Sequence, residues 1–182
     1  ELAYRAGGKE CDECLNPAPD SLDTRNLAIM SMFQYMIGNA DWNLKMMRNL
    51  KFIRREDSGK HLTIPYDFDF AGLVNAPYAV PNTDYGLTDI RQRLFLGPPL
   101  DDARMKWTIN YFKFKREEMI QYVRDFRLLS KDNREDIIGF LEYFFEHLES
   151  KELRLASNLY EEFSEEPLNY QSTNGTDSDV GM

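Results

Sequence analysis

The sequence predicts an α+β domain that is mainly helical and contains one β-hairpin. Two short apolar runs, Leu50–Ile53 and His61–Pro65, have the length of strands. The charged segment between them, Arg54–Lys60, has Asp-Ser-Gly at its centre, which favours a turn between two strands. Elsewhere, apolar residues recur at three- and four-residue intervals, the spacing of a helix with one buried face. This spacing is found in three segments: 23–37, 100–126 and 133–148.

The first of these helices has clear start and stop signals. Ser21 or Asp23 can cap it, and its apolar spacing continues to about Ile37. Gly38-Asn39 can end it, because both residues tolerate a positive φ. The preceding segment, Lys9–Ser21, contains prolines and no apolar periodicity, so we expect it to be a loop.

The later helices complete a single expected domain over residues 1–163. Pro98-Pro99 precedes the second helix, and Asn133 can cap the third. A shorter helix is expected at Lys151–Phe163. Residues 164–182 are acidic and then rich in Ser, Thr, Asn and Gly, which predicts a disordered tail.

Composition narrows the possible partners. The chain has 182 residues, enough for one compact core, and its 42% hydrophobic and 29% charged residues are typical of a soluble globular protein. With 22 basic and 31 acidic residues the net charge is −9, which argues against nucleic-acid binding through a basic surface. No apolar run approaches the roughly 20 residues that span a bilayer, so no membrane span is expected. Compartment and oligomeric state do not follow from the sequence.

The two cysteines form a single C-x-x-C. A structural zinc site usually has four ligands, and the two histidines, His61 and His147, are distant in sequence from Cys11 and Cys14. The residues after Cys14 do not resemble the helix start of a thioredoxin-like redox motif. We therefore expect two incidental cysteines in a polar loop, without a zinc or redox function.

Polar side chains flank the hairpin at both of its open ends. Asp41 and Asn49 precede the first strand, and Asp67 and Asp69 follow the second. A hairpin would bring these four side chains together. Clustered carboxylates repel one another and need a cation, and oxygen ligands of this kind suit magnesium or calcium.

Each of these side chains also has a purely structural interpretation. Asp41 could form an Asx turn on a surface loop. On an extended strand, Asp67 and Asp69 would point to one side while Phe68 and Phe70 face the core, and an exposed strand edge gives the same alternation. However, the run before Asp67 is too apolar for an exposed strand. Two carboxylates at the end of a buried strand are costly unless a metal or an arginine neutralises them.

The order of these residues resembles the catalytic core of protein-kinase-like phosphotransferases. The sequence IGNADW at 37–42 is followed by Asn49 and by IPYDFDFAG at 64–72. The last segment is similar to the metal-binding strand end of HipA-type and CotH-type atypical kinases, and to uncharacterised bacterial proteins with an IGNxDW…N…PYDFD pattern. The resemblance covers about residues 23–97. It implies the fold of a kinase C-terminal lobe, with a β-hairpin that carries the site and several packed helices.

The resemblance also implies a role for each candidate residue. Asp41 would be the catalytic residue that orients the acceptor hydroxyl and accepts its proton. Asn49 and Asp67 would bind ATP through Mg²⁺ or Mn²⁺, and Asp69 would be a second metal ligand or the partner of an arginine. In ordinary kinases the metal-binding Asn lies five residues after the catalytic Asp, a position held here by Met46. Asn49 lies eight residues after it, directly before the strand, so Asn43 remains an alternative.

The segment after the acidic cluster has the position of a kinase activation segment. Residues Gly72–Gly97 have no clear periodicity and contain several Pro, Asn and Gly residues, which predicts a long ordered loop. Arg91 and Arg93 could place two guanidinium groups near the carboxylates or a phosphate. Alternatively, both lie on the surface of a helix.

The start of the sequence also bears on the resemblance. Glu1–Gly8 reads as the last turns of a helix that ends at a glycine. No phosphate-covering Gly-rich loop followed by a strand lysine is visible. Both observations lead us to expect that this chain is the C-lobe portion of a longer protein and that the N-lobe is missing from the chain.

The sequence thus favours an ATP-dependent phosphotransferase that moves a phosphoryl group to an unidentified hydroxyl acceptor. One alternative is a catalytically inactive kinase-like binding domain, which the displaced Asn favours. Another is a metal-dependent hydrolase that uses the same carboxylates to activate water. The lack of zinc-type histidine ligands makes the hydrolase the last choice.

Overall fold

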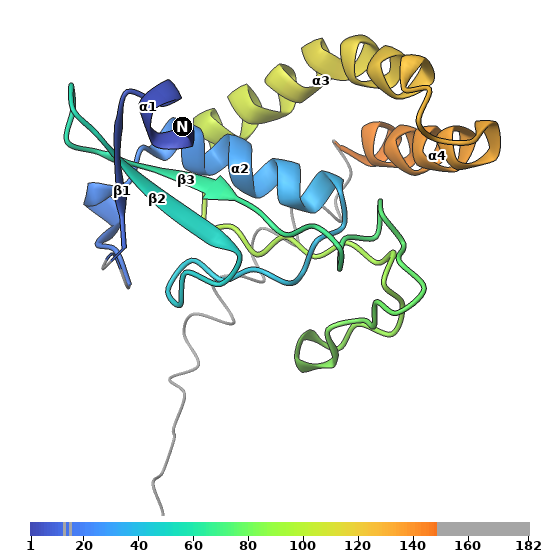
Figure 1. The fold of residues 1–182 in the computed structure, drawn as a ribbon, viewed down its shortest axis with the longest axis horizontal. Coiled ribbons are helices and arrows are strands. Elements are labelled where there is room, and N and C mark those ends of the chain that lie inside the picture. The colour runs from blue at the N-terminus through green and yellow to red at the C-terminus, as the bar shows by residue number, and fades with distance from the viewer. Residues whose placement is uncertain (13, 15, 149–182) are drawn as a thin grey trace, which may run out of the picture.

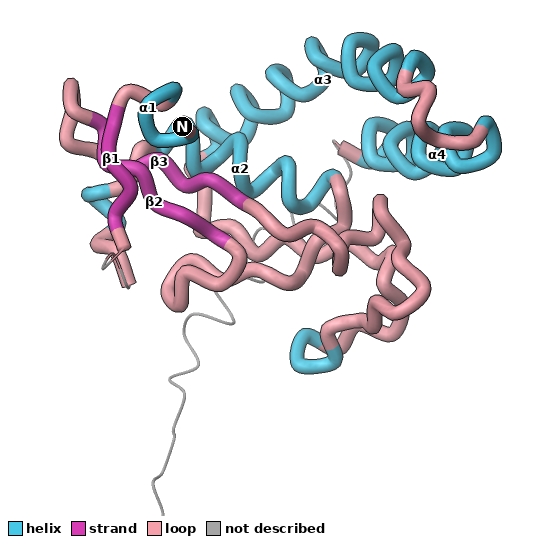
Figure 2. Tube along the Cα trace, viewed as in Figure 1, coloured by secondary structure: helices cyan, strands magenta, loops and turns pink. Residues whose placement is uncertain are grey.

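The computed structural model describes residues 1–12, 14 and 16–148, and it has the expected mixed α+β fold (Figure 1). Three strands form one sheet, and the long helices lie beside it or follow it in the chain (Figure 2). The helices are α1 (Leu2–Arg5), α2 (Thr24–Met36), α3 (Asp102–Asp125) and α4 (Lys131–His147), with single 3₁₀ turns η1 (Pro19–Ser21) and η2 (Thr83–Tyr85). The strands are β1 (Gly8–Cys11), β2 (Leu50–Arg55) and β3 (His61–Pro65).

The predicted hairpin is confirmed, and the sheet has one strand more than expected. β2 and β3 pair antiparallel, with Leu50 opposite Pro65 and Arg54 opposite His61. β1 pairs antiparallel with the other edge of β2 and places Cys11 opposite Phe52. The expectation of a loop from Lys9 onward was therefore wrong at its start. The strand sequence Gly-Lys-Glu-Cys has no apolar alternation, so backbone pairing with β2 rather than side-chain burial defines it.

Helix α2 connects the sheet to the other helices, since it contacts β3 on one side and α3 on another. As predicted, Asp23 caps it by accepting a hydrogen bond from the Asn26 N–H at 2.8 Å. The Asn26 side-chain oxygen in turn accepts hydrogen bonds from the Thr63 N–H and hydroxyl at 2.7 and 2.8 Å. These bonds satisfy the open edge of β3 and fix the hairpin against the helix. After the helix, Gly38 has the expected left-handed conformation.

Two apolar clusters fill the space on either side of α2. The smaller cluster lies between α2 and the sheet and is formed by Leu22, Leu27, Met30, Trp42, Leu50 and Phe52. The larger cluster joins α2, α3 and α4 and includes Met32, Met36, Phe95, Phe112, Ile120, Leu141, Phe144 and Leu148. The apolar residues of the first predicted helix, including Met30, Met36 and the partly buried Phe33, belong to these clusters, as their spacing predicts.

The last two described helices pack against each other as an antiparallel pair (Figure 1). Asp101 caps α3, and Ser130 caps α4 by accepting from the Asn133 N–H at 3.1 Å. The prediction that Asn133 is the cap was therefore wrong by one turn. The helix expected at Lys151–Phe163 and the tail expected at 164–182 lie outside the described residues. Within the described part of the chain, no helix has the length and apolar character needed to cross a membrane.

A long connection without regular strands runs from the end of β3 to α3 (Figure 2), as the sequence predicts. It crosses the end of α2, where the Gly72 N–H donates to the Gly38 carbonyl at 3.0 Å. A Cβ atom on Gly72 would lie 2.7 Å from the carbonyl oxygen of Ile90 and 2.9 Å from the Cα of Arg91. The backbones are therefore in contact here, and only glycine fits without displacing the loop.

This contact gives a prediction about stability. Gly72→Ala should destabilise the fold by about 1–3 kcal/mol, because the added methyl group overlaps backbone atoms that cannot rotate away. Gly139 in α4 is a matched control, since a Cβ atom added there would have no other atom within 4 Å. Gly139→Ala should stabilise the fold by about 0.5–1 kcal/mol. Urea unfolding of both variants measures the two effects, and equal values for them would contradict the packing described.

Candidate functional site

The open ends of the hairpin meet, as the sequence led us to expect. Asn49 directly precedes β2, and the Tyr66 N–H, directly after β3, donates to the Asn49 carbonyl at 3.1 Å. Asp67 is the next residue, so it lies beside Asn49. The loop that carries Asp41 folds back onto the same place through side-chain contacts with Asn49.

The Asn49 amide is held in a defined orientation. Its Nδ2 group donates to the Asp41 carbonyl oxygen at 2.6 Å and to Asp41 Oδ2 at 2.9 Å. Because both acceptors are oxygens, the opposite amide orientation would place oxygen against oxygen. The Oδ1 atom of Asn49 therefore points away from Asp41 and is available as an acceptor or a metal ligand. The residue has a left-handed backbone, with φ of 55°, which sequence reasoning did not anticipate.

Asn43, the alternative metal ligand, has a different role. Its side-chain oxygen accepts a hydrogen bond from the Met46 N–H at 3.0 Å. Its backbone exchanges hydrogen bonds with Arg48 at 3.1 and 3.0 Å, which closes a tight turn. The side chain that could bind a cation is thus used to form this turn. The geometry favours Asn49 over Asn43.

A buried polar pair fixes the position of Asp41, and sequence reasoning missed it. The Asp41 N–H donates to the side-chain oxygen of Asn39 at 2.8 Å. The Asn39 amide donates to Gln34 Oε1 at 3.1 Å, and both residues are fully buried. The prediction that Asn39 has a positive φ after α2 was wrong. Asn39 instead supports the loop through the hydrogen bonds of its side chain. The sequence does hold one signal of this buried pair, because Gln34 is a polar residue at an apolar position of the helix.

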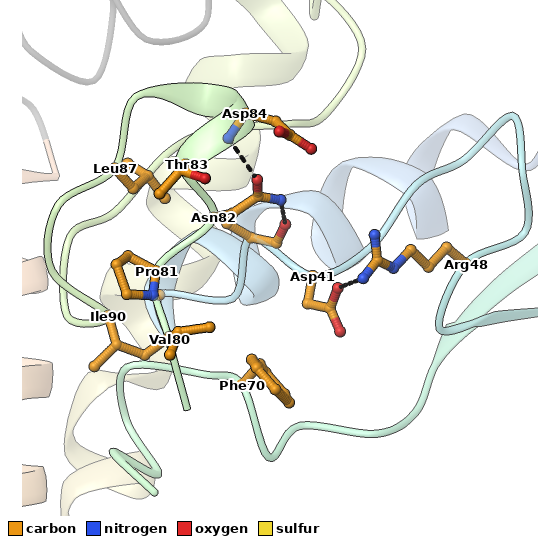
Figure 3. A pocket seen from close by; sticks show the side chains of 12 residues that line it. Asp41, Arg48, Phe70, Val80, Pro81, Asn82, Thr83, Asp84, Leu87 and Ile90 are labelled. Atoms are coloured by element: carbon orange, nitrogen blue, oxygen red, sulfur yellow. Dashed lines mark hydrogen bonds and ion pairs between the residues drawn. The ribbon is translucent and has the colours of Figure 1, made fainter. Parts of the chain in front are cut away.

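Both carboxylate oxygens of Asp41 have partners. Asn49 donates to Oδ2, and Arg48 forms an ion pair with Oδ1 (Figure 3). The Asp41 side chain is 20% exposed and the Arg48 side chain is 55% exposed, so the ion pair lies at the surface. An ion pair of this exposure contributes little to stability, and the arginine can move away at small cost.

Asp67 and Asp69 lie together, but for a different reason from the one predicted. The prediction placed both acids on one face of an extended strand. β3 ends at Pro65, however, and Asp67 has a left-handed φ of 58°, so the backbone is not extended at Asp67. A side-chain hydrogen bond to Asp69 and the charge of that residue raise the pKa of Asp67, and partial desolvation and the charge of Asp41 raise it further. The charges of Asp41 and Asp69 thus both act on Asp67.

The aromatic residues next to the acids have divided roles. Phe68 packs edge-on against Phe33 of α2, with ring centroids 5.9 Å apart, as expected of a core residue. Phe70 instead contacts Tyr78, with centroids 6.3 Å apart, and lines a pocket. The prediction that both phenylalanines face the core was therefore right only for Phe68. Desolvation raises the pKa of Tyr78, and the charge of Asp69 and a hydrogen bond between the two side chains raise it further. The Tyr78 hydroxyl is therefore a neighbour of the acidic cluster.

A cavity of about 280 Å³ opens beside Asp41 (Figure 3). One wall is the loop that carries Asp41 and Arg48, and the facing wall is the segment 80–90 together with Phe70. Asn82 fixes the two walls to each other, because its Nδ2 donates to the Ala40 carbonyl at 3.2 Å. The carboxylate of Asp41 thus lies at the edge of a space that could admit a small polar group.

The two arginines of the long loop do not have either of their predicted positions. Arg91 pairs with Asp136 of α4 at 2.8 Å, and neither arginine lies on a helix. Arg93 donates to the carbonyls of Met36 at 3.1 Å and Phe140 at 2.6 Å, with its guanidinium 3.7 Å from the Phe140 ring centroid. Burial lowers the pKa of Arg93 to about 10. These groups connect the loop to α2 and α4 and do not bind the site carboxylates.

The expectation of two incidental cysteines in a polar loop was wrong, since Cys11 ends β1 and forms a disulfide with Cys14. They also lie close to His61, which is distant in sequence. In the described residues, these three side chains are the one group of at least three His, Cys, Asp or Glu residues whose ligand atoms all lie within 4.8 Å of one another. Asp41, Asp67 and Asp69 do not form such a group in the described residues.

The acidic cluster predicts a specific pH dependence. Because the pKa of Asp67 is raised in the folded state, the stability that protonated Asp67 contributes is fully present at low pH and is lost as the pH rises through that pKa. Asp69→Asn should lower the pKa of Asp67 toward its ordinary value and remove this loss. Carbon-13 NMR titration of the carboxyl signals measures the pKa of Asp67 in the unmodified protein and in the Asp69→Asn variant. Asp57→Asn, in the β2–β3 turn, is the control, and an unchanged Asp67 pKa in the Asp69→Asn variant would contradict the arrangement.

Comparison of the chain with protein-family models, with curated proteins and with solved structures gives no match. The assignment of function therefore depends on the side-chain geometry and on the order of the residues that form it.

Proposed function

We propose that this chain is the C-lobe of a kinase-like, ATP-dependent phosphotransferase that acts on a hydroxyl acceptor. Asn49 and Asp67 would hold Mg²⁺ or Mn²⁺ together with the nucleotide phosphates, and Asp69 would assist as a second carboxylate. Asp41 would orient the acceptor hydroxyl. These are the roles that the resemblance implies.

The observation that carries the proposal is the orientation of Asn49. Its amide hydrogens bond to Asp41, so its oxygen faces away from that residue, and its backbone carbonyl accepts from Tyr66, the residue before Asp67. Among the ion pairs of the described residues, none includes Asp67 or Asp69. An amide oxygen beside carboxylates that lack a cationic partner is a ligand set that magnesium or manganese prefers.

The position of Asp41 supports its separate role. It is bonded to the proposed metal ligand Asn49 on one side and borders the cavity on the other. In the proposed reaction, the acceptor oxygen attacks the γ-phosphorus, the bond to the β-phosphate oxygen breaks, ADP leaves, and the hydroxyl proton passes to the Asp41 carboxylate. Arg48 would move from Asp41 for this to happen.

The pairing of Asp41 also favours the second candidate, a catalytically inactive kinase-like binding domain. Arg48 and Asn49 each contact one of the two oxygens of this carboxylate. If Arg48 stays in place when nucleotide binds, it hinders the approach of an acceptor hydroxyl to the carboxylate. No observation favours the metal-dependent hydrolase, and it remains only an outcome to test.

Metal-dependent nucleotide binding is the first test. ATP with Mg²⁺ should raise the melting temperature of the protein, and Asp67→Asn should remove this shift because the metal loses a carboxylate ligand. Asp57→Asn removes a carboxylate at the far end of the same hairpin and should leave the shift unchanged. A shift that persists without Mg²⁺, or in Asp67→Asn, would contradict the assignment of the ligand.

Phosphoryl transfer is the second test. With γ-labelled ATP and a panel of protein, sugar and lipid hydroxyl acceptors, Asp41→Asn should keep the Mg·ATP melting shift but reduce transfer by about 10²-fold or more. Arg48→Gln should retain transfer if the arginine moves aside. Binding without transfer by the unmodified protein would identify the inactive domain. Phosphate release from varied phosphoesters without an acceptor would identify the hydrolase.

A further inference from the structure

The second polar group of interest lies where β1 ends and β3 begins, away from the acidic cluster. Cys11 ends β1, Cys14 follows in the loop, and His61 begins β3. Asp67 lies beyond the opposite end of that strand. The three side chains come from two segments that are about 50 positions apart in the sequence but adjacent in the fold.

The fold brings the histidine to the cysteines through backbone pairing. The backbone of His61 pairs with Leu22, and its carbonyl accepts from the Asp23 N–H at 2.9 Å. Cys11 is fixed on the other side by its pairing with Phe52. Both cysteines pack against the apolar cluster between α2 and the sheet, and all three residues are partly buried. The group therefore has a supported position rather than the freedom of an exposed loop.

The histidine ring is also oriented by a partner. His61 Nδ1 lies 3.2 Å from the Ser21 carbonyl oxygen. Because a carbonyl oxygen only accepts, Nδ1 carries the hydrogen, and Nε2 of the neutral ring keeps its lone pair. A backbone carbonyl that fixes the ring in this way is the usual second partner of a metal-binding histidine.

We propose that Cys11, Cys14 and His61 form a zinc site that the disulfide closes and reduction opens. Two thiolates and an imidazole select a thiophilic cation such as Zn²⁺ over Mg²⁺ or Ca²⁺. In the described residues, no fourth His, Cys, Asp or Glu joins the group, so the fourth position would be taken by water. The site is distinct from the proposed Mg·ATP site in both position and ligand chemistry.

Disulfide and metal exclude each other at this site. A dithiol reductant supplies two electrons and two protons, so the Cys11–Cys14 bond becomes two thiols while the reductant becomes a disulfide. Zinc then binds the two sulfurs, and the two thiol protons are released to the solvent. Oxidation with loss of the metal reverses the sequence. The site would thus report the thiol redox state of its surroundings.

The test is zinc binding by the full chain in its two redox states. Protein reduced with a trialkylphosphine should bind one Zn²⁺ per chain by equilibrium dialysis and metal analysis, and the disulfide form should bind none at this site. Cobalt as a probe should give thiolate charge-transfer absorption in the reduced form only. Absence of zinc binding by the reduced protein would overturn the proposal.

The histidine provides the sharper comparison. His61→Gln can still donate to the Ser21 carbonyl, so it should keep the fold while weakening zinc binding by about tenfold or more. His147→Gln is the matched control, because His147 bonds only to Tyr143 of its own helix in the described contacts, and it should bind zinc as the unmodified protein does. If His61→Gln binds zinc with unchanged affinity, the three-ligand site is wrong. Cys14→Ser should lose both the disulfide and the site.

Discussion

The hydrogen bonds from the Asn49 amide to Asp41 connect the parts of this molecule on which its proposed function depends. They join the loop after α2 to the entry of β2, and the Asn49 carbonyl continues the connection to the exit of β3. Three segments that are separate in the sequence therefore meet at one residue. The rest of the fold supports this junction: α2 fixes the hairpin through Asn26, and the buried Asn39–Gln34 pair fixes the loop.

The acidic cluster follows the end of β3, whereas the cysteine group includes the residue that begins β3, and the two groups have opposite ligand chemistry. Oxygen ligands and mutual repulsion at Asp67 favour a hard divalent cation. Sulfur and nitrogen ligands at Cys11, Cys14 and His61 favour zinc. The contact between Asn49 and Tyr66 and the position of Cys11 both depend on the register of β2 with its neighbours, because a slip by one residue would change which residues face one another. Strand pairing is thus the common support of both sites.

Much of this arrangement could be predicted because its signals are local. The cap at Asp23, the stop at Gly38 and the turn chemistry between the two apolar runs each depend on a few adjacent residues. What could not be predicted depends on contacts between distant segments. β1 is defined by its pairing with β2, and the partners of Arg91 and Arg93 are set by the approach of α4. No local signal indicates the left-handed φ of Asp67. The proximity of His61 to the cysteines is of the same kind, since no local pattern in either segment indicates it.

The proposed function depends most on a divalent cation bound between Asn49 and Asp67. Paramagnetic Mn²⁺ added to isotopically labelled protein tests this directly, since it broadens amide signals of nearby residues. We expect that the signals of Asn49, Asp67 and Asp69 broaden first, that Asp57 at the turn stays sharp, and that excess Mg²⁺ restores the lost signals. Broadening spread evenly over the exposed carboxylates, or its absence at Asn49 and Asp67, would contradict the proposed cation site.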